Sequence, residues 1–159
     1  MRKISLFFAL FLLLLQSCLT DEEPTADEAF KQALLTQMNK YRQRGCKCGT
    51  TTMPPVAPLV WNSLLEKAAR RHANDMAAHA HFDHIGTDGS TSAKRITDAG
   101  YDWIAVGENI AFGYTSANEL IDGWLKSADH CENIMNANFK EMGVAEVDTY
   151  WVQTLGRQK

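Results

Sequence analysis

The sequence predicts an α+β fold, and two observations carry this prediction. Apolar residues recur at helical spacing in several segments of the chain. Two short apolar runs separated by a turn then follow near its end, as in a β-hairpin. Because the helices precede most of the strands instead of alternating with them, the pattern indicates α+β and not α/β. The 159 residues suffice for one domain and little else.

The first half of the chain is predicted to hold two long helices. The first covers residues 27–44, where the apolar positions share one helical face and a glycine follows. The stretch 46–58 contains three prolines, a glycine and a threonine run, so we expect an extended loop. Asn62 or Ser63 can cap the second helix, which runs to about His79.

The second half is predicted to mix short helices and strands. Residues 93–99 form a short helical piece, and residues 107–114 read as a loop leading into a short extended segment. A capping box at Ser116 opens a further helix. Residues 142–147 and 150–155 are two strands joined by a turn, which makes a hairpin.

Residues 1–17 have the features of a lipoprotein signal peptide. Two basic residues precede an apolar run of about a dozen residues, which is too short to span a bilayer but fits the core of an export signal. The sequence Leu-Gln-Ser-Cys at residues 15–18 resembles a lipobox, in which the cysteine receives lipid and becomes the new N-terminus. The alternative is an ordinary signal peptide with an incidental cysteine. We therefore predict export and a lipid anchor at Cys18.

An acidic, proline-containing tether is predicted at residues 18–27, followed by one domain at residues 28–159. Cleavage before Cys18 would leave fourteen Lys and Arg against nineteen Asp and Glu, a net charge near −5. No stretch is basic enough to follow a phosphate backbone, which excludes nucleic acid as a partner. The acidic residues after the anchor also resemble the surface-export signal of some Bacteroidetes-type lipoproteins, which favours the outer membrane or cell surface.

Three further cysteines, Cys46, Cys48 and Cys131, would reach an oxidising compartment, where a disulfide can persist. Cys46 and Cys48 are too close in sequence to pair without strain. The pattern therefore predicts a bridge from one of them to Cys131 and leaves one thiol over. Such a bridge stabilises the fold by up to about 4–5 kcal/mol on the chain-entropy model. A zinc site of all three cysteines is the alternative, but Cys-x-Cys is not the usual zinc spacing.

Histidine is the most informative residue type, because four of the five histidines lie within thirteen positions. His72 and His79 lie two turns apart on the apolar face of a predicted helix, and such histidines are more often hydrogen-bonded core residues than ligands. His79, His81 and His84 could form a compact metal cluster. They straddle the end of a helix, however, and match no recognised ligand spacing. His130 stands apart from the others.

A stronger signal comes from segments taken in order along the chain. These segments are 38–42 (MNKYR), 64–76 (LLEKAARRHANDM), 82–84 with 88–89, 107–111 (GENIA), and 123–127 with 130–135 and 142–144. Together they span about residues 30–156 and resemble the secreted domain shared by cysteine-rich secretory proteins, wasp antigen five and plant pathogenesis-related proteins, the CAP or SCP-like family.

The resemblance implies a three-layer α-β-α sandwich with a central cleft lined by two histidines and two acids. Matched residue by residue, the histidines are His84 and His130, and the first acid is Glu108. The second acid has no match, since Ser127 stands near its place. Two imidazoles and a carboxylate are ligands that suit Zn²⁺ or another divalent cation, and they equally suit acid–base chemistry.

The resemblance also implies a disulfide pairing. Bacterial members of the family often carry a Cys-Gly and a His-Cys pair, which stand here as Cys48-Gly49 and His130-Cys131. The resemblance therefore selects Cys48, and not Cys46, as the partner of Cys131.

Three functions compete on these residues. The first is a non-enzymatic binding module that is held at the membrane by its N-terminal lipid. Its cleft of His84, Glu108 and His130 holds a divalent cation or a small ligand, with lipids, wall glycans or an envelope protein as candidate partners. The second is a metal-assisted, peptidase-like hydrolase with Glu108 as base. The third is a structural or adhesive envelope domain. No serine or cysteine lies in an activated motif, which favours a non-enzymatic function.

Overall fold

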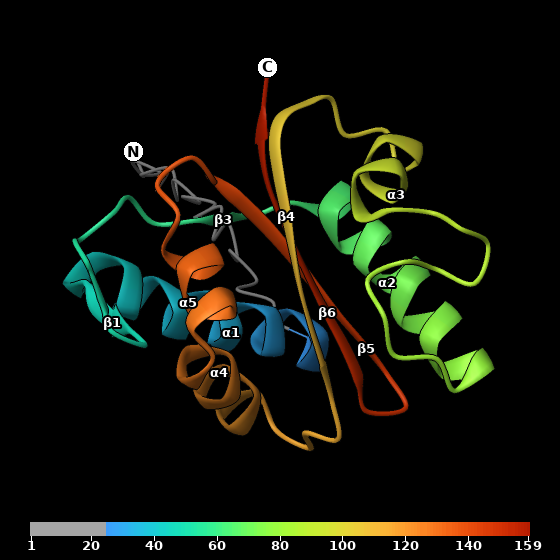
Figure 1. Ribbon diagram of the computed structural model, residues 1–159, viewed down its shortest axis with the longest axis horizontal. Helices are drawn as coiled ribbons and strands as arrows, with labels where there is room; N and C mark the ends of the chain where they lie inside the picture. Colours follow the sequence, from blue (N-terminus) through green and yellow to red (C-terminus); the bar gives the residue numbers. More distant parts are fainter. Residues whose placement is uncertain (1–24) are drawn as a thin grey trace, which may run out of the picture.

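The computed structural model describes residues 25–159 of the protein (Figure 1). The predicted signal peptide, the predicted anchor Cys18 and most of the predicted tether lie outside these residues. Within the described part of the chain, no helix is both long enough and apolar enough to cross a membrane.

A four-stranded sheet forms the middle layer of the molecule (Figure 1). Its strands in spatial order are β3 (Val60–Trp61), β5 (Glu141–Val147), β6 (Tyr150–Gln158) and β4 (Trp103–Phe112). Strand β3 pairs parallel with β5, and the other pairs are antiparallel. The sheet is therefore mixed, and the predicted α+β class is confirmed.

Helices cover both faces of this sheet, which makes the three-layer α-β-α sandwich that the family resemblance implied (Figure 1). On one face lie α2 (Ser63–His79) and α3 (Ser92–Asp98). The other face carries α1 (Ala26–Arg44), α4 (Ala117–Lys126) and α5 (Ala128–Met135). The apolar core is accordingly split by the sheet into a larger part beneath α1, α4 and α5 and smaller parts beneath α2 and α3.

Capping side chains determine where the long helices begin. Thr25 and Glu28 form a reciprocal capping box, so α1 starts at Ala26, inside the segment predicted as tether. The Asn62 side chain accepts hydrogen bonds from the first backbone amides of α2, so Asn62 is the N-cap residue and Ser63 is the first residue of the helix. Helix α2 packs closely on the sheet because Gly143 leaves room for its backbone.

Strand β4 differs from the prediction, which placed a loop leading into a short extended segment at residues 107–114. It is a ten-residue strand paired along its length with β6. Four consecutive residues, 108–111, are buried, because helices cover both faces of the sheet at this point. The sequence therefore lacks the alternation of apolar and polar residues by which a half-exposed strand is recognised.

Two smaller elements were also not predicted. The expected loop 46–58 contains a two-stranded ribbon, β1 (Cys46–Cys48) and β2 (Thr51–Met53). A separate helix, α5, follows α4 after a break at Ser127. The predicted hairpin is present, and its turn residues Asp148 and Thr149 both have positive φ, as tight antiparallel hairpins prefer.

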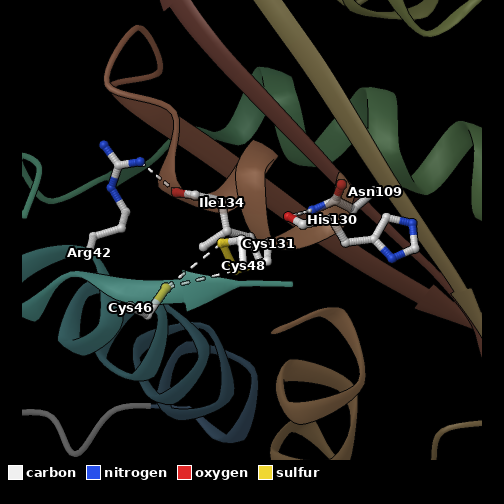
Figure 2. Close-up of a disulfide and its surroundings, with 7 residues drawn as sticks. All are labelled: Arg42, Cys46, Cys48, Asn109, His130, Cys131 and Ile134. Atoms are coloured by element: carbon white, nitrogen blue, oxygen red, sulfur yellow. Dashed lines mark hydrogen bonds between the residues drawn. A yellow bond between two sulfur atoms is a disulfide. The ribbon is translucent and has the colours of Figure 1, made fainter. Parts of the chain in front are cut away.

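A disulfide and a buried arginine attach the ribbon and α5 to the rest of the domain (Figure 2). The Cys48–Cys131 disulfide joins β1 to α5, and the Cys46 thiol stays free. Arg42 of α1 is fully buried and donates hydrogen bonds to backbone carbonyls only. One acceptor is Ala57, in the segment after the ribbon. The others are Ile134 and Asn136 at the end of α5, and Phe139 in the segment before β5.

Candidate histidine site

The candidate site is built around two neighbouring residues of β4. Successive side chains of a strand point to opposite faces of the sheet. Glu108 therefore points toward the layer of α2 and α3, and Asn109 toward the layer of α5. Each of these side chains supports the segment that carries one of the predicted histidines, so a single strand holds both sides of the site.

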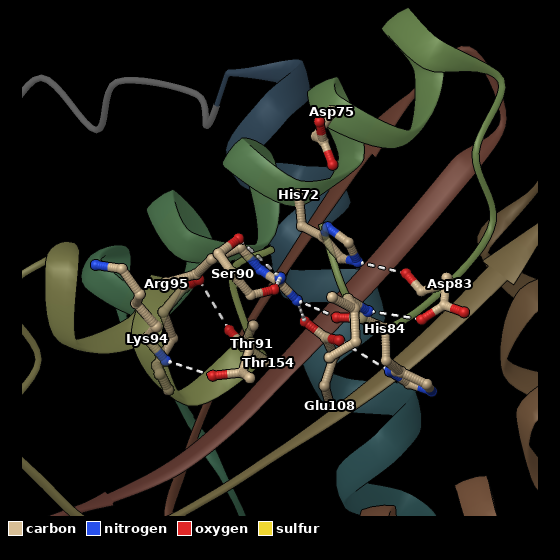
Figure 3. A network of polar contacts seen from close by, with 12 residues as sticks. His72, Asp75, Asp83, His84, Ser90, Thr91, Lys94, Arg95, Glu108 and Thr154 are labelled. Atoms are coloured by element: carbon tan, nitrogen blue, oxygen red, sulfur yellow. Dashed lines mark hydrogen bonds and ion pairs between the residues drawn. The ribbon is translucent and has the colours of Figure 1, made fainter. Parts of the chain in front are cut away.

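On the α2 and α3 side, Glu108 lies between two basic side chains (Figure 3). The Nδ1–H of His84 donates to Glu108 Oε1 at 2.9 Å, and Arg95 Nη2 donates to Glu108 Oε2 at 2.8 Å. The side chains of Arg95 and Glu108 are only 1% and 3% exposed, whereas that of His84 is 53% exposed. Both oxygens of the buried carboxylate therefore accept a hydrogen bond. The Nε2 atom of the His84 ring is not part of these bonds.

The loop that carries His84, residues 80–91, is attached to α2 and α3 by polar contacts (Figure 3). His72 of α2 is fully buried, and its Nε2–H donates to the Asp83 carbonyl at 2.9 Å. Arg95 of α3 donates to the carbonyls of Ser90 and His84 at 2.7 and 3.0 Å. His72 is therefore the hydrogen-bonded core residue that its position in the sequence predicted.

On the α5 side, a network of side-chain amides holds the backbone of His130, and Figure 2 shows its bond from Asn109 to the His130 carbonyl. Asn109 is fully buried and donates to the His130 carbonyl at 3.1 Å and to Gln153 Oε1 at 2.9 Å. Asn133 of α5 donates to Asn109 Oδ1 at 2.9 Å. These bonds fix the backbone of α5 against β4 and leave the His130 imidazole outside the network.

Both His84 and His130 line a shallow surface depression of about 290 Å³. Its lining residues are Phe82, Asp83, His84, Ile110 and His130. Further aromatic rings continue from its apolar side. The Phe82 and Phe112 rings lie 6.3 Å apart between centroids, and those of Phe112 and Tyr150 lie 4.4 Å apart. Phe82 and Phe112 are both more than half exposed, so a ligand at the histidines would also touch an aromatic surface.

The environment moves the pKa values of the two histidines in opposite directions. The hydrogen bond to Glu108 raises the pKa of His84 and outweighs the effect of burial. Burial lowers the pKa of His130, and the neighbouring His84 lowers it further. Burial alone would raise the pKa of Glu108, but the bond from His84 and the charge of Arg95 turn the net shift downward. Glu108 is therefore held as a carboxylate, and His130 is the more readily neutral imidazole.

The structure brings His84, Glu108 and His130 to one place, but not as three equivalent ligands. Glu108 contacts His84 and Arg95 with its two oxygens. Within residues 25–159, the only three-residue group of potential ligands whose donor atoms all lie within 4.8 Å of one another consists of Cys46, Cys48 and Cys131. A cation at the histidine site would therefore bind His84 Nε2 and a His130 nitrogen, with Glu108 behind His84.

His79 differs from the interpretation of it as a core residue, because its side chain is 55% exposed and its Nδ1–H donates to the Asp75 carbonyl. The His81 ring bonds to the Ile85 carbonyl, and neither His79 nor His81 lines the depression. Ser127 joins α4 to α5 and does not line it either. Arg95 was not predicted at all, because a basic residue on a short helix usually faces solvent. Its thirteen-residue distance from Glu108 gave no recognisable spacing.

Comparison with known proteins places these features in a family. Residues 35–154 match the cysteine-rich secretory protein family, CAP. The uncharacterised protein YkwD of Bacillus subtilis is 29% identical over 137 residues, which cover 84% of this chain and 49% of YkwD. The chain thus spans about half the length of that relative.

Two solved structures share the fold. One is an extracellular protein containing an SCP domain from Bacillus anthracis, with a TM-score of 0.71 and 24% identity, covering 86% of this chain and 45% of that one. The other is an outer surface protein of Borrelia burgdorferi, with a TM-score of 0.70 and 20% identity, covering 83% of this chain and 95% of that one. The family match covers most of the described residues and contains both histidines, Glu108 and the disulfide. The chain therefore belongs to the cysteine-rich secretory protein family, CAP.

Proposed function

We propose that this protein is an exported, lipid-anchored binding module that holds a divalent cation between His84 and His130. The observation that carries the proposal is the hydrogen bond from His84 Nδ1 to the buried carboxylate of Glu108. It selects the tautomer whose Nε2 lone pair is free, at a depression that His130 also lines.

The donor set fits Zn²⁺. Zinc accepts imidazole nitrogens at about 2.0–2.1 Å, and a histidine that binds it typically gives its other N–H to a carboxylate or carbonyl. Glu108 supplies such a carboxylate, and Arg95 keeps it ionised in a buried setting. Two protein ligands leave coordination positions open to an oxygen of a ligand, so the bound ion would supply a Lewis-acidic contact for a carboxylate, carbonyl or phosphate group.

Hydrolysis is the weaker candidate, because it needs Glu108 to accept a proton. One oxygen of Glu108 is committed to Arg95, the other accepts from His84, and its pKa is lowered. A carboxylate held in this way is a poor general base near neutral pH. Turnover of a peptide or glycan library that a chelator abolishes would nevertheless reverse this ranking. A purely structural network predicts that no metal is retained.

The place of the module follows from the N-terminal sequence. The apolar run and the lipobox-like Cys18 support export and attachment to a membrane, and the acidic segment supports display at the outer membrane or cell surface. The partners within reach would be lipids, wall glycans or envelope proteins. Incorporation of labelled fatty acid should occur in the wild-type chain and be lost in Cys18→Ser. Incorporation that persists in this variant would refute the anchor.

The cation is tested by elemental mass spectrometry of the protein purified without reductant and dialysed against Zn²⁺. About one zinc per chain is expected in the wild type, and none in His84→Ala/His130→Ala. The matched control is His79→Ala/His81→Ala, which removes two nearby histidines outside the depression and should leave the zinc in place. Equal zinc in both double variants, or none in the wild type, would contradict the proposal.

A further inference from the structure

Three sulfur atoms gather where α5 packs on β1, and the histidine site uses none of them, although Cys131 directly follows His130 on α5 (Figure 2). Cys46 and Cys48 are two residues apart on β1, so their side chains point to the same side of the strand. Cys131 of α5 faces them and forms the disulfide with Cys48. The Cys46 sulfur lies 3.9 Å from Cys48 Sγ and 3.7 Å from Cys131 Sγ.

These two distances match the spacing of thiolates around a metal ion. Metal–sulfur bonds in zinc sites are about 2.3 Å, so two thiolates at tetrahedral or trigonal angles lie about 3.8–4.0 Å apart. Cys46 already stands at that distance from both other sulfurs. Only the two disulfide-bonded sulfurs have to separate, and the Cα atoms of Cys48 and Cys131 are 5.4 Å apart, one on a short ribbon and the other on a short helix.

We propose that reduction of the Cys48–Cys131 disulfide turns this cluster into a three-thiolate site for a thiophilic ion such as Zn²⁺ or Cu⁺. The reductant is a dithiol, which gives two electrons and two protons to the disulfide and becomes a disulfide itself. The three resulting thiols lose their protons as the ion binds. Oxidation therefore closes the site and reduction opens it.

The burial of the cluster determines how the ion would enter. Cys48 and Cys131 are fully buried, whereas Cys46 is only partly buried. The ion reaches the cluster past Cys46, and its fourth coordination position faces the same way. The proposal thus gives a role to Cys46, the cysteine that is not part of the disulfide. The site shares no side chain with His84 and His130, so each proposal can fail without the other.

The test uses Cd²⁺ titrated into the full chain carrying Cys18→Ser, so that the cluster holds its only cysteines. Thiolate-to-cadmium charge-transfer absorption reports sulfur ligands alone, which makes the histidine site silent. The charge-transfer band should grow to one equivalent of Cd²⁺ in the reduced chain and should be absent in the oxidised chain. The matched variant Cys46→Ser keeps the disulfide partners. Loss of a direct ligand should weaken its cadmium binding by more than the roughly 10–100-fold that loss of an outer partner costs.

Near-ultraviolet circular dichroism of the four tryptophans monitors folding in every sample. A native signal that reduction weakens and cadmium restores supports the proposal. A reduced chain that shows no charge-transfer band, folded or not, refutes it. So does a band of equal intensity and affinity in Cys46→Ser, or a band in the oxidised chain.

Discussion

Replacement of Arg95 by methionine should strongly destabilise the domain. Arg95 donates four hydrogen bonds: three of 2.7–3.0 Å, to the Ser90 and His84 carbonyls and to Glu108, and one of 3.3 Å to the Ser90 hydroxyl. Both partners of its ion pair with Glu108 are buried. Methionine fills much of the same volume but leaves the Glu108 carboxylate without its neutralising charge. Removal of one partner from a buried ion pair typically costs about 3–5 kcal/mol, a large share of the stability of a domain of this size.

Urea denaturation followed by tryptophan fluorescence measures this loss. With a slope of about 2 kcal/mol per molar urea, a loss of 3–5 kcal/mol moves the midpoint down by about 1.5–2.5 M. The double variant Arg95→Met/Glu108→Gln separates the charge from the packing, because it also removes the stranded carboxylate. We expect it to be more stable than Arg95→Met alone.

Acidification provides an independent check on the same residue. The depressed pKa of Glu108 means that its ion pair stabilises the wild type above the unfolded-state pKa of about 4.3, and that this contribution is lost as pH falls through the folded-state pKa. The difference in free energy of unfolding between the wild type and Arg95→Met should therefore become smaller as the pH falls. A loss below about 1 kcal/mol in Arg95→Met, or a double variant that loses the full sum of both single variants, would refute the reasoning.

Further predictions concern neighbouring residues. Glu108→Gln should lower the pKa of His84 toward its ordinary value, as followed by NMR titration; an unchanged pKa would mean that Glu108 does not raise it. Burial lowers the pKa of His72, so the wild type should lose stability as pH falls below about 6.5, whereas His72→Gln should lose less; equal urea midpoint changes between about pH 7 and about pH 5 would contradict this. Gly143→Ala places a methyl group against the backbone of Glu66 and should lower stability by about 1–3 kcal/mol or more in thermal melts, and an unchanged melting temperature would show that α2 can shift away.

The helices other than α5 and the hairpin could be predicted, because local patterns determine them. Helix α2 has an N-cap residue and a single buried face, and the hairpin has two apolar runs around a turn. Strand β4 could not be recognised, since burial on both faces removes the alternation that marks a strand.

The candidate site was predicted only in part. His84, Glu108 and His130 came from a family resemblance and not from local spacing. The supporting residue Arg95 came from neither, because it reaches the His84 carbonyl and Glu108 from a separate helix. The sequence alone does not tell a buried arginine from a solvent-exposed one, because burial depends on the fold.

The strand order has a consequence for how the chain is made. Strands β5 and β6 are central in the sheet, and the two earlier strands pair only with them. Until residues 141–158 have been synthesised, β3 and β4 have no strand to pair with. The chain therefore leaves the ribosome with helices that have no sheet to pack on, and folding must wait until both central strands have emerged. For the proposed export, such a delay would keep the chain unfolded while it crosses the membrane.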